Sequence, residues 1–370
     1  MTSKICCFFN YPSHYRESIY NLMDKEIGCD FVFGDEEPSI KEMDCGVLSN
    51  VKRVHYTWIL KKILYIKNVL LYLVLNYDTI VVTPATNSIT HWLLLLLYKM
   101  LPNRRIYYWT HGLYGWESKR QLFFKNLMFK NATGLFLYGN YAKKIMIANG
   151  YNPNKMHVVF NSMDYDNQIN LRERIESSDI FKKHFNNSNS TIIVIGRLNR
   201  RKKIDLLVNA VNNLKNKDII INVVIVGDGE EKERLEQMVS DFDLKKQFWF
   251  YGACYDEYTN AELIYNSDLC VVPGDIGLTA IHAMTYGVPV ISHDCFPSQG
   301  PEIEIIEPGV TGKLFKYDDV LSLTAAIHDW LIMKGPDRNH IREACYSVIE
   351  NHWNPYYQLT VLKKVLLGTS

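Results

Sequence analysis

The chain has 370 residues, of which 47% are hydrophobic and 22% charged, a composition typical of a folded soluble protein with two domains rather than one core. Its charge is unevenly divided: residues 1–165 hold 19 Lys and Arg against 12 Asp and Glu, and the remainder holds 22 against 28. We expect only the basic first half to meet an anionic partner, and we expect no nucleic acid among the partners.

The cysteines and the apolar runs indicate the compartment. The eight cysteines show no Cys-x-x-Cys spacing and no His at metal spacing, so they are expected to be reduced thiols. The run at 5–9 is too short for a signal peptide, and the run at 93–97 is far below the roughly twenty residues of a membrane span. We expect a cytoplasmic protein with no resident metal or cofactor.

Short apolar runs alternate with amphipathic stretches through the first half, which predicts strands alternating with helices. The strands are expected at 5–9, 31–34, 79–83, 106–109, 134–138 and 157–160. The helices are expected at about 14–26, 57–75, 86–100, 118–130 and 140–149. This alternation is typical of a doubly wound parallel sheet.

The alternation restarts after a polar segment. Strands are expected at 191–195, 219–226, 248–251, 269–272 and 289–292, and helices at 204–214, 230–242, 260–266, 278–286, 319–333, 336–352 and 356–367. The predicted fold is therefore α/β, with two Rossmann-like lobes facing each other across a cleft. The lobes are expected at 1–165 and 191–350, with a linker at 166–190 and a last helix at 351–370 returning towards the first lobe.

The strongest functional signal lies between residues 271 and 312. A buried-strand pattern ends at Pro273-Gly274, and a helical pattern begins at Leu278 and ends before Gly287. A loop of this kind leaves backbone N–H groups without partners at the positive end of the helix dipole. We expect it to bind a phosphate or a diphosphate.

A basic pair accompanies this loop. Arg197 stands at the tip of the predicted strand 191–195, and Lys202 follows five residues later. At the mouth of a cleft the two cations would clamp a diphosphate and stabilise its charge as it departs. The alternative is a solvated basic turn at 200–203.

The order of motifs from 191 to 315 resembles the donor-binding lobe of glycosyltransferase family 4, whose members are retaining enzymes of the two-lobed GT-B type. The motifs are a strand followed by Gly-Arg, then Lys, Gly-x-Gly, Ser-Asp-Leu, Pro-Gly, Gly-Leu, Ala-Met, Tyr-Gly-Val-Pro-Val-Ile and Gly-x-Thr-Gly. The resemblance implies a nucleotide diphosphate sugar as donor, with its diphosphate on the N–H groups around Gly277, Leu278 and Thr279. A variant subgroup found among bacterial surface-polysaccharide transferases is the best match.

The family carries two glutamates where this chain has Gly274 and His282. By resemblance, position 282 would bind the ribose, and a neutral His offers one acceptor and one donor there instead of a carboxylate. A helix histidine bonded within the protein is the equal alternative. At position 274 the contact to the sugar would pass to backbone N–H groups or to Asp275.

Three further side chains are candidates. Glu304 precedes a Gly-x-x-Gly turn where the family has a sugar- or ribose-contacting Glu, and Glu302 competes with it, because only one of the two faces the cleft if the segment is extended. His111 ends a predicted strand in the first lobe, where the resemblance implies contact with the donor sugar or the acceptor. Arg16 follows the first strand and is a candidate contact for the acceptor or a diphosphate.

Residues 52–76 interleave Lys and Arg with Trp, Tyr, Leu and Ile. With Trp92 and the run at 93–97, they predict a basic apolar face that lies on an anionic bilayer. Two ordinary buried helices with snorkelling lysines are the alternative. A membrane contact would suit a lipid-linked glycan acceptor.

The resemblance as a whole implies a retaining, metal-independent hexosyl- or deoxyhexosyltransferase of surface polysaccharide synthesis. Because no acid is an obvious nucleophile, a front-face attack is the expected route, with Arg197, Lys202 and His111 as the catalytic residues. Two other classes stay open: a nucleotide-sugar epimerase on the same fold, and a non-catalytic hinge-type protein that binds a sugar or a nucleotide.

Overall fold

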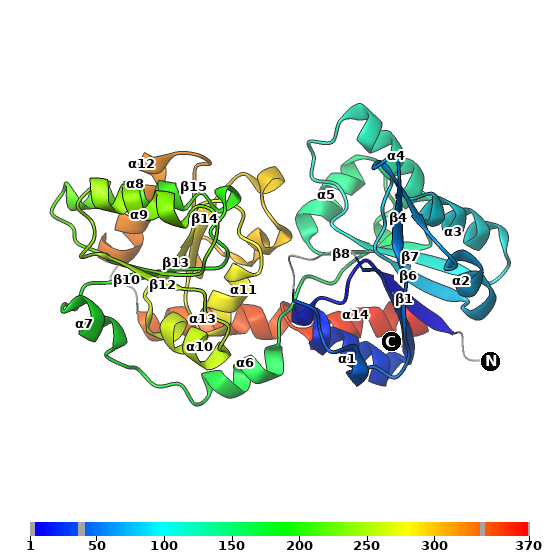
Figure 1. The fold of residues 1–370 in the computed structure, drawn as a ribbon, viewed down its shortest axis with the longest axis horizontal. Helices are drawn as coiled ribbons and strands as arrows, with labels where there is room; N and C mark the ends of the chain where they lie inside the picture. The colour runs from blue at the N-terminus through cyan, green and yellow to red at the C-terminus, as the bar shows by residue number, and fades with distance from the viewer. Residues whose placement is uncertain (1–3, 36–40, 334–336, 369–370) are drawn as a thin grey trace. The chain divides into compact units, whose positions relative to one another are not determined.

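Two separate units make up the chain, as the computed structural model shows (Figure 1). The structure describes residues 4–35, 41–333 and 337–368. Unit 1 comprises Met1–Asp164 and Asn354–Ser370, and unit 2 comprises Tyr165–Trp353. Each unit holds one parallel sheet with helices on both of its faces. The predicted α/β class with two Rossmann-like lobes is confirmed.

Unit 1 is built on a seven-stranded sheet in the order β3-β2-β1-β6-β7-β8-β9, parallel throughout. Its strands are β1 (Ile5–Phe9), β2 (Cys29–Phe33), β3 (Val51–Arg53), β6 (Thr79–Val82), β7 (Arg105–Thr110), β8 (Gly134–Leu137) and β9 (Met156–Val158). The edge strand β3 has no counterpart in the sequence prediction, because it is only three residues long and its side chains are partly or fully exposed.

The two faces of this sheet are covered by different helices. Alternate residues of β1 divide between them: Cys6 and Phe8 join one core, and Ile5, Cys7 and Phe9 the other. The first core lies under α2 (Leu70–Asn76), α3 (Ile89–Met100), α4 (Lys119–Lys130) and α5 (Asn140–Ala148). The second lies under α1 (Glu17–Ile27) and α14 (Pro355–Leu367), so the C-terminal helix is part of unit 1.

The helix predicted at 57–75 is wrong. A β-hairpin of β4 (Tyr56–Ile59) and β5 (Ile63–Ile66) stands there, and only α2 at its end is helical. Burial alternates along β5, with Leu64 and Ile66 buried and Ile63 and Tyr65 exposed, which is the period of a strand. None of the helices in the described ranges is both long and apolar enough to cross a membrane.

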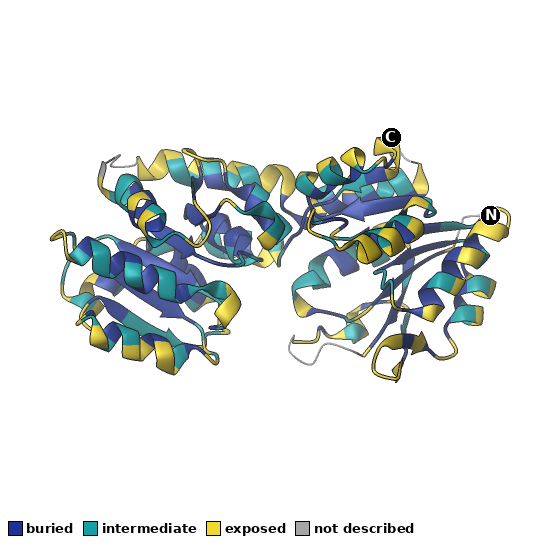
Figure 2. Cartoon of the chain, turned by 90° about the horizontal axis from the view of Figure 1, so that it is seen from above, coloured by how far each residue is buried: buried dark blue, intermediate teal, exposed yellow. Residues whose placement is uncertain are grey.

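Unit 2 is built on a six-stranded parallel sheet in the order β12-β11-β10-β13-β14-β15. Its strands are β10 (Thr191–Ile195), β11 (Asn222–Val226), β12 (Phe248–Gly252), β13 (Leu269–Val272), β14 (Val290–His293) and β15 (Gly312–Phe315). Figure 2 shows both sheets buried between helices whose outer faces are exposed.

The helices of unit 2 cover both faces of its sheet (Figure 1). They are α6 (Tyr165–Arg172), α7 (Ile180–Phe185), α8 (Ile204–Lys215), α9 (Lys232–Asp241), α10 (Glu257–Asn266), α11 (Thr279–Thr285), α12 (Val320–His328), the π-helical turn Asp329–Met333 and α13 (Arg338–His352). Apolar side chains of α8, α9 and α12 form one core with β10 and β11.

The segment 166–190, expected to be a linker, is a packed part of unit 2. It holds most of α6 and all of α7. Phe181 is buried, and the ring of His184 stacks on Trp249 with 3.8 Å between centroids. The polar composition of this segment hid these contacts, because they are made by single side chains to distant strands rather than by an apolar period.

A partly buried acid joins α6 to the rest of unit 2. Glu257 Oε1, at the start of α10, accepts hydrogen bonds from Gln168 Nε2 at 2.9 Å, His282 Nε2 at 2.9 Å and the Tyr286 hydroxyl at 2.7 Å. Burial raises the pKa of this carboxyl, but the hydrogen bonds and the His282 ring outweigh it and lower the pKa to about 2. The carboxylate therefore holds three helices together.

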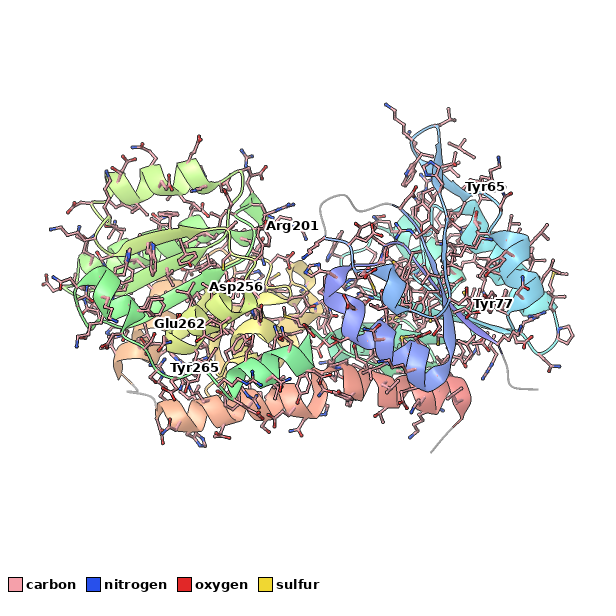
Figure 3. The ribbon with its side chains drawn as sticks, turned by 60° about the horizontal axis from the view of Figure 1, so that its bottom comes forward. Tyr65, Tyr77, Arg201, Asp256, Glu262 and Tyr265 are labelled. Carbon is pink, nitrogen blue, oxygen red and sulfur yellow. The ribbon has the colours of Figure 1, made fainter. Side chains whose placement is uncertain are left out.

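We expect Glu257→Gln to lower the free energy of unfolding by about 2 kcal/mol at pH 7. A folded-state pKa below the unfolded value gives stability that is present above pH ~4.3 and lost as pH falls through the folded pKa of about 2. The difference from wild type in urea unfolding should therefore shrink between pH 5 and pH 2. Glu262→Gln on the same helix (Figure 3) is the control, and a difference equal at pH 3 and pH 7 would contradict this role.

Candidate functional site

The loop between β13 and α11 presents backbone donors at the carboxyl edge of the unit 2 sheet. Asp275 N donates to Arg201 O at 2.9 Å, and Ile276 N donates to Gln299 Oε1 at 2.8 Å. The next three N–H groups, from Gly277 to Thr279, have no acceptor within the described ranges, and no side chain caps α11. These are the donors that the sequence predicts for a diphosphate.

Lys202 is anchored beneath this loop. Its Nζ donates to the carbonyls of Asp275 at 2.7 Å and Ile276 at 3.2 Å, and a Cβ on Gly277 would lie 3.8 Å from it. Burial lowers the pKa of Lys202, while the Asp275 and Glu302 carboxylates act in the opposite direction. The ammonium thus orders the loop and places a positive charge under its free N–H groups.

Arg197 lies next to the same loop. Thr279 Oγ1 donates to Ile195 O at 3.1 Å, which ties the start of α11 to the end of β10, two residues before Arg197. The Arg197 side chain is exposed and forms no hydrogen bond or ion pair in the part of the chain that is described. The fold therefore brings Arg197, Lys202 and the loop 277–279 to one edge of the sheet.

A close backbone contact explains Gly274. A Cβ at this position would collide with Arg201 O and would lie 2.7 Å from the Lys202 carbonyl carbon. The glutamate that the family pattern expects here does not fit unless the turn at 200–202 moves. The carboxylate of Asp275 lies beside this position instead, bonded to Arg201 at 2.9 Å (Arg201 is labelled in Figure 3).

Glu302 is closer to the loop than Glu304. The segment Pro301–Ile305 is a 3₁₀ helix, so the strand alternation that would make Glu302 and Glu304 exclude each other does not apply. Glu302 is buried, and Glu304 is partly buried. A Cβ on Gly300 would lie 2.5 Å from Glu302 Oε2 and 3.6 Å from Gly277 N, which puts the Glu302 carboxylate near the free N–H groups.

His282 is buried one turn into α11, and its Nε2 bonds Glu257. This is the geometry of a helix histidine bonded within the protein. When Nε2 carries the proton, Nδ1 is left as an acceptor, so the ribose contact stays a prediction for that atom alone.

His111 belongs to unit 1, where it follows β7 and is exposed. Its ring lies 4.6 Å from the ring of Tyr138 and 6.0 Å from that of Tyr114, between centroids. Its contact with a sugar stays a prediction.

Sequence reasoning missed three side chains that order these sites: Glu257, Gln299 and Tyr138. Gln299 is buried and also donates to Ser292 Oγ at 2.8 Å, so it fastens the loop to β14. No motif marks these residues, although the Gln-Gly-Pro-Glu turn at 299–302 was a signal of a special backbone.

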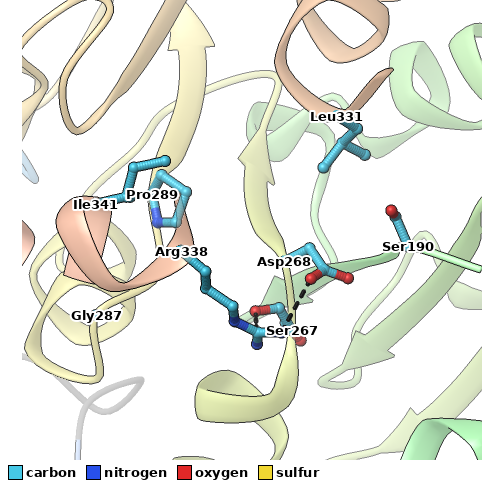
Figure 4. Close-up of a pocket in the computed structure, with 8 residues that line it drawn as sticks. All are labelled: Ser190, Ser267, Asp268, Gly287, Pro289, Leu331, Arg338 and Ile341. Carbon is cyan, nitrogen blue, oxygen red and sulfur yellow. Dashed lines mark hydrogen bonds and ion pairs between the residues drawn. The ribbon is translucent and has the colours of Figure 1, made fainter. Parts of the chain in front are cut away.

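A pocket of about 210 Å³ opens at the opposite edge of the unit 2 sheet (Figure 4). Its residues Ser190, Asp268 and Pro289 precede strands, whereas ligands of open parallel sheets bind at the carboxyl ends. Arg338 in this pocket is satisfied by Asp268 at 3.1 Å and by two carbonyls. Within the described ranges, no group of three or more His, Cys, Asp or Glu is arranged to hold a metal ion.

We expect Gly274→Ala to destabilise the protein by about 3 kcal/mol in urea unfolding, because the new Cβ meets backbone that must shift. Gly28→Ala is the control: Gly28 has a positive φ of 72°, which Gly274 does not, and nothing lies within 4 Å of its Cβ position. It should cost only about 1 kcal/mol. Equal losses in the two variants would mean that the contact with the 200–202 turn is not tight.

The segment that carries this site is similar in sequence to known proteins. Residues 176–348 match the model of glycosyl transferases group 1. An uncharacterized 41.2 kDa protein in the cps region of Klebsiella pneumoniae is 24% identical over 261 residues, which cover 66% of this chain and 65% of that protein. An uncharacterized glycosyltransferase of Haemophilus influenzae is 30% identical over 125 residues, 33% of this chain and 34% of that one. The chain thus spans just under two thirds of the length of the first relative and about one third of the length of the second.

Solved structures share the fold over the full length. The lipopolysaccharide outer core galactosyltransferase WaaB has a TM-score of 0.73 at 15% identity and covers 99% of both chains. HepE of Anabaena in complex with UDP has a TM-score of 0.74 at 16% identity over 99% of this chain and 100% of that one. A glycosyltransferase from Rickettsia africae gives 0.74 at 16% over all of both chains. Unit 2 therefore contains the segment that matches the glycosyl transferases group 1 model, and the whole chain shares the two-lobed GT-B fold of these glycosyltransferases.

Proposed function

We propose that this protein is a retaining enzyme of glycosyltransferase family 4 that moves a sugar from a nucleotide diphosphate sugar to a glycan acceptor. The observation that carries the proposal is the loop at 277–279, whose unpaired N–H groups lie over the Lys202 ammonium and beside Arg197. Neutral ligands would not need two cations and a row of donors at one point. The binding of UDP by HepE supports a nucleotide-bearing donor.

The reaction that we propose is a front-face substitution. The acceptor hydroxyl oxygen bonds to the anomeric carbon as the bond from that carbon to the diphosphate breaks, and the leaving phosphate takes the hydroxyl proton. Arg197, Lys202 and the loop N–H groups stabilise the charge that develops on the diphosphate. His111 contacts the sugar or the acceptor, and Glu304 or its neighbour Glu302 the donor sugar. Because these cations serve the leaving group, turnover should persist in EDTA.

Surface polysaccharide synthesis is the pathway class that we propose, with a lipid-linked glycan as acceptor. The relative from the cps region of Klebsiella pneumoniae supports it. An epimerase would turn over the donor without any acceptor, and a hinge-type binding protein would bind it without turnover. Measuring donor consumption with and without an acceptor therefore distinguishes both alternatives from a transferase.

The test is transfer by the full chain after a thermal-shift screen selects the nucleotide sugar that stabilises it most. We expect Arg197→Gln to reduce kcat/KM for the donor about 100-fold, because a cation on the leaving group is lost. Arg200→Gln in the same loop is the matched control. The Arg200 guanidinium is exposed and pairs with Glu231 at 3.3 Å, so we do not expect it to serve the donor. Nuclear magnetic resonance of the new anomeric bond should report retention.

An inverted product would contradict the retaining mechanism, and equal activity of the Arg197→Gln and Arg200→Gln variants would contradict the role of Arg197. Donor conversion without an acceptor would favour the epimerase.

We also propose that the protein is cytoplasmic and lies on the membrane through unit 1. Its basic apolar face consists of the hairpin β4–β5 and the outer sides of α2, α3 and α4. The exposed apolar residues there are Trp58, Ile59, Leu60, Ile63, Tyr65, Leu71, Leu75, Ile89, Leu93, Leu96, Met100, Phe123, Phe124 and Leu127. Residues 51–131 contain twelve Lys and Arg but only two acids, Asp78 and Glu117. Exposed apolar groups among cations suit an anionic bilayer better than water.

Flotation of the full chain with vesicles tests the basic apolar face. We expect binding to phosphatidylcholine vesicles that contain phosphatidylglycerol and little binding without it. Reversing the charges at the hairpin, Lys61→Glu with Lys62→Glu, should reduce the bound fraction at least about fivefold. The matched control reverses the exposed pair Lys182 and Lys183 on α7 of unit 2. Equal binding of the two double variants would remove this face from the proposal.

A further inference from the structure

Arg16 is a cation held among aromatic rings at the carboxyl edge of the unit 1 sheet. It ends the 3₁₀ turn His14–Arg16 between β1 and α1. Its guanidinium carbon lies 5.2 Å from the ring centroid of Tyr138 and 5.7 Å from those of Trp109 and Tyr15. Its Nη2 donates a hydrogen bond to the Tyr138 hydroxyl.

No carboxylate pairs with Arg16 in the ranges that the structure describes. A partly buried cation loses part of its hydration, and aromatic faces compensate only part of that loss, so an anion would stabilise it. A guanidinium has five N–H donors, and one of them is used here. None of its nitrogens is among the fully buried, unpaired atoms, so the other donors remain open to solvent. This is the arrangement of an anion receptor.

Two other loops bring polar groups to the same place. Tyr138 follows β8, and His111 follows β7, with their ring centroids 4.6 Å apart. The Tyr138 hydroxyl accepts from Arg16 and so fixes the direction in which the guanidinium points. Three loops at the carboxyl ends of parallel strands thus converge, which is where such sheets bind ligands.

We infer that Arg16, Tyr138 and His111 form an anion subsite in unit 1 for a phosphate group carried by the acceptor. That this phosphate belongs to an acceptor rests on the proposed function, whereas the binding of an anion does not. The donor diphosphate has its own cations and N–H groups in unit 2, so a second, separate cation in unit 1 serves a different phosphate. The planar fork of Arg16 matches phosphate oxygens through two parallel hydrogen bonds.

The experiment measures binding to the full chain by saturation-transfer nuclear magnetic resonance at low ionic strength. Phenyl phosphate is the probe for the subsite, phenol its uncharged counterpart, and UDP the probe for the donor site. We expect wild type to prefer phenyl phosphate to phenol, and Arg16→Gln to raise the Kd for phenyl phosphate about tenfold. The Kd for UDP should change less than twofold.

Two further variants keep the test independent of folding. Arg16→Lys keeps the charge without the fork and should fall between wild type and Arg16→Gln, and Tyr138→Phe keeps the ring but should weaken the probe several-fold. Arg174→Gln, an exposed arginine of unit 2, should leave both probes unchanged.

Three results would overturn the subsite: no preference of wild type for phenyl phosphate over phenol, unchanged phenyl phosphate binding in Arg16→Gln, or an equal loss of UDP affinity, which would assign Arg16 to the donor. Failure of the proposed function appears separately, as a protein that binds no nucleotide and transfers no sugar whatever the result with phenyl phosphate.

Discussion

The donor-side architecture depends on the contact between two stretches of backbone, the turn at 200–202 and the loop at 274–276. Lys202 Nζ bridges the carbonyls of Asp275 and Ile276, and the Asp275 N–H returns a hydrogen bond to Arg201 O. With these carbonyls turned down onto a cation, the N–H groups of the following residues are left without partners. One contact between distant segments therefore produces both the charge and the donors that an anionic ligand needs.

The same contact accounts for a difference from the family 4 motif that the sequence resembles. A side chain at 274 would meet the backbone of the turn, so the carboxylate usual at this position is excluded, and acidic groups reach the neighbourhood from Asp275 and Glu302 instead. At position 282, where the motif has a glutamate, α11 carries His282. The carboxylate is supplied by Glu257 of α10, which bonds the His282 ring. Glu257 also accepts hydrogen bonds from Gln168 and Tyr286, so the same carboxylate holds α6 against α10.

In unit 1, the two faces and the carboxyl edge of the parallel sheet carry different groups of residues. One face is covered by α1 and α14, which close the core around Phe9 and Tyr20. The other is covered by the hairpin and α2 to α5, whose outer surfaces carry apolar side chains and almost no acids. The carboxyl edge holds Arg16 without a carboxylate partner among the described residues. The excess of Lys and Arg in the first half of the sequence therefore lies on the surface of unit 1, since both cores of its sheet are apolar.

The sequence by itself determined the elements with a strong local period and their order, hence two doubly wound sheets. It also determined the loop after β13, because Pro-Gly after an apolar run and Gly before a helical period are local signals. Only the tertiary structure decided the hairpin, the packing of 166–190, the strands β3 and β15, and the partners of His282 and Lys202. These features arise from contacts between residues far apart in the chain. A local pattern records the backbone preference of a segment but not the side chain that will meet it.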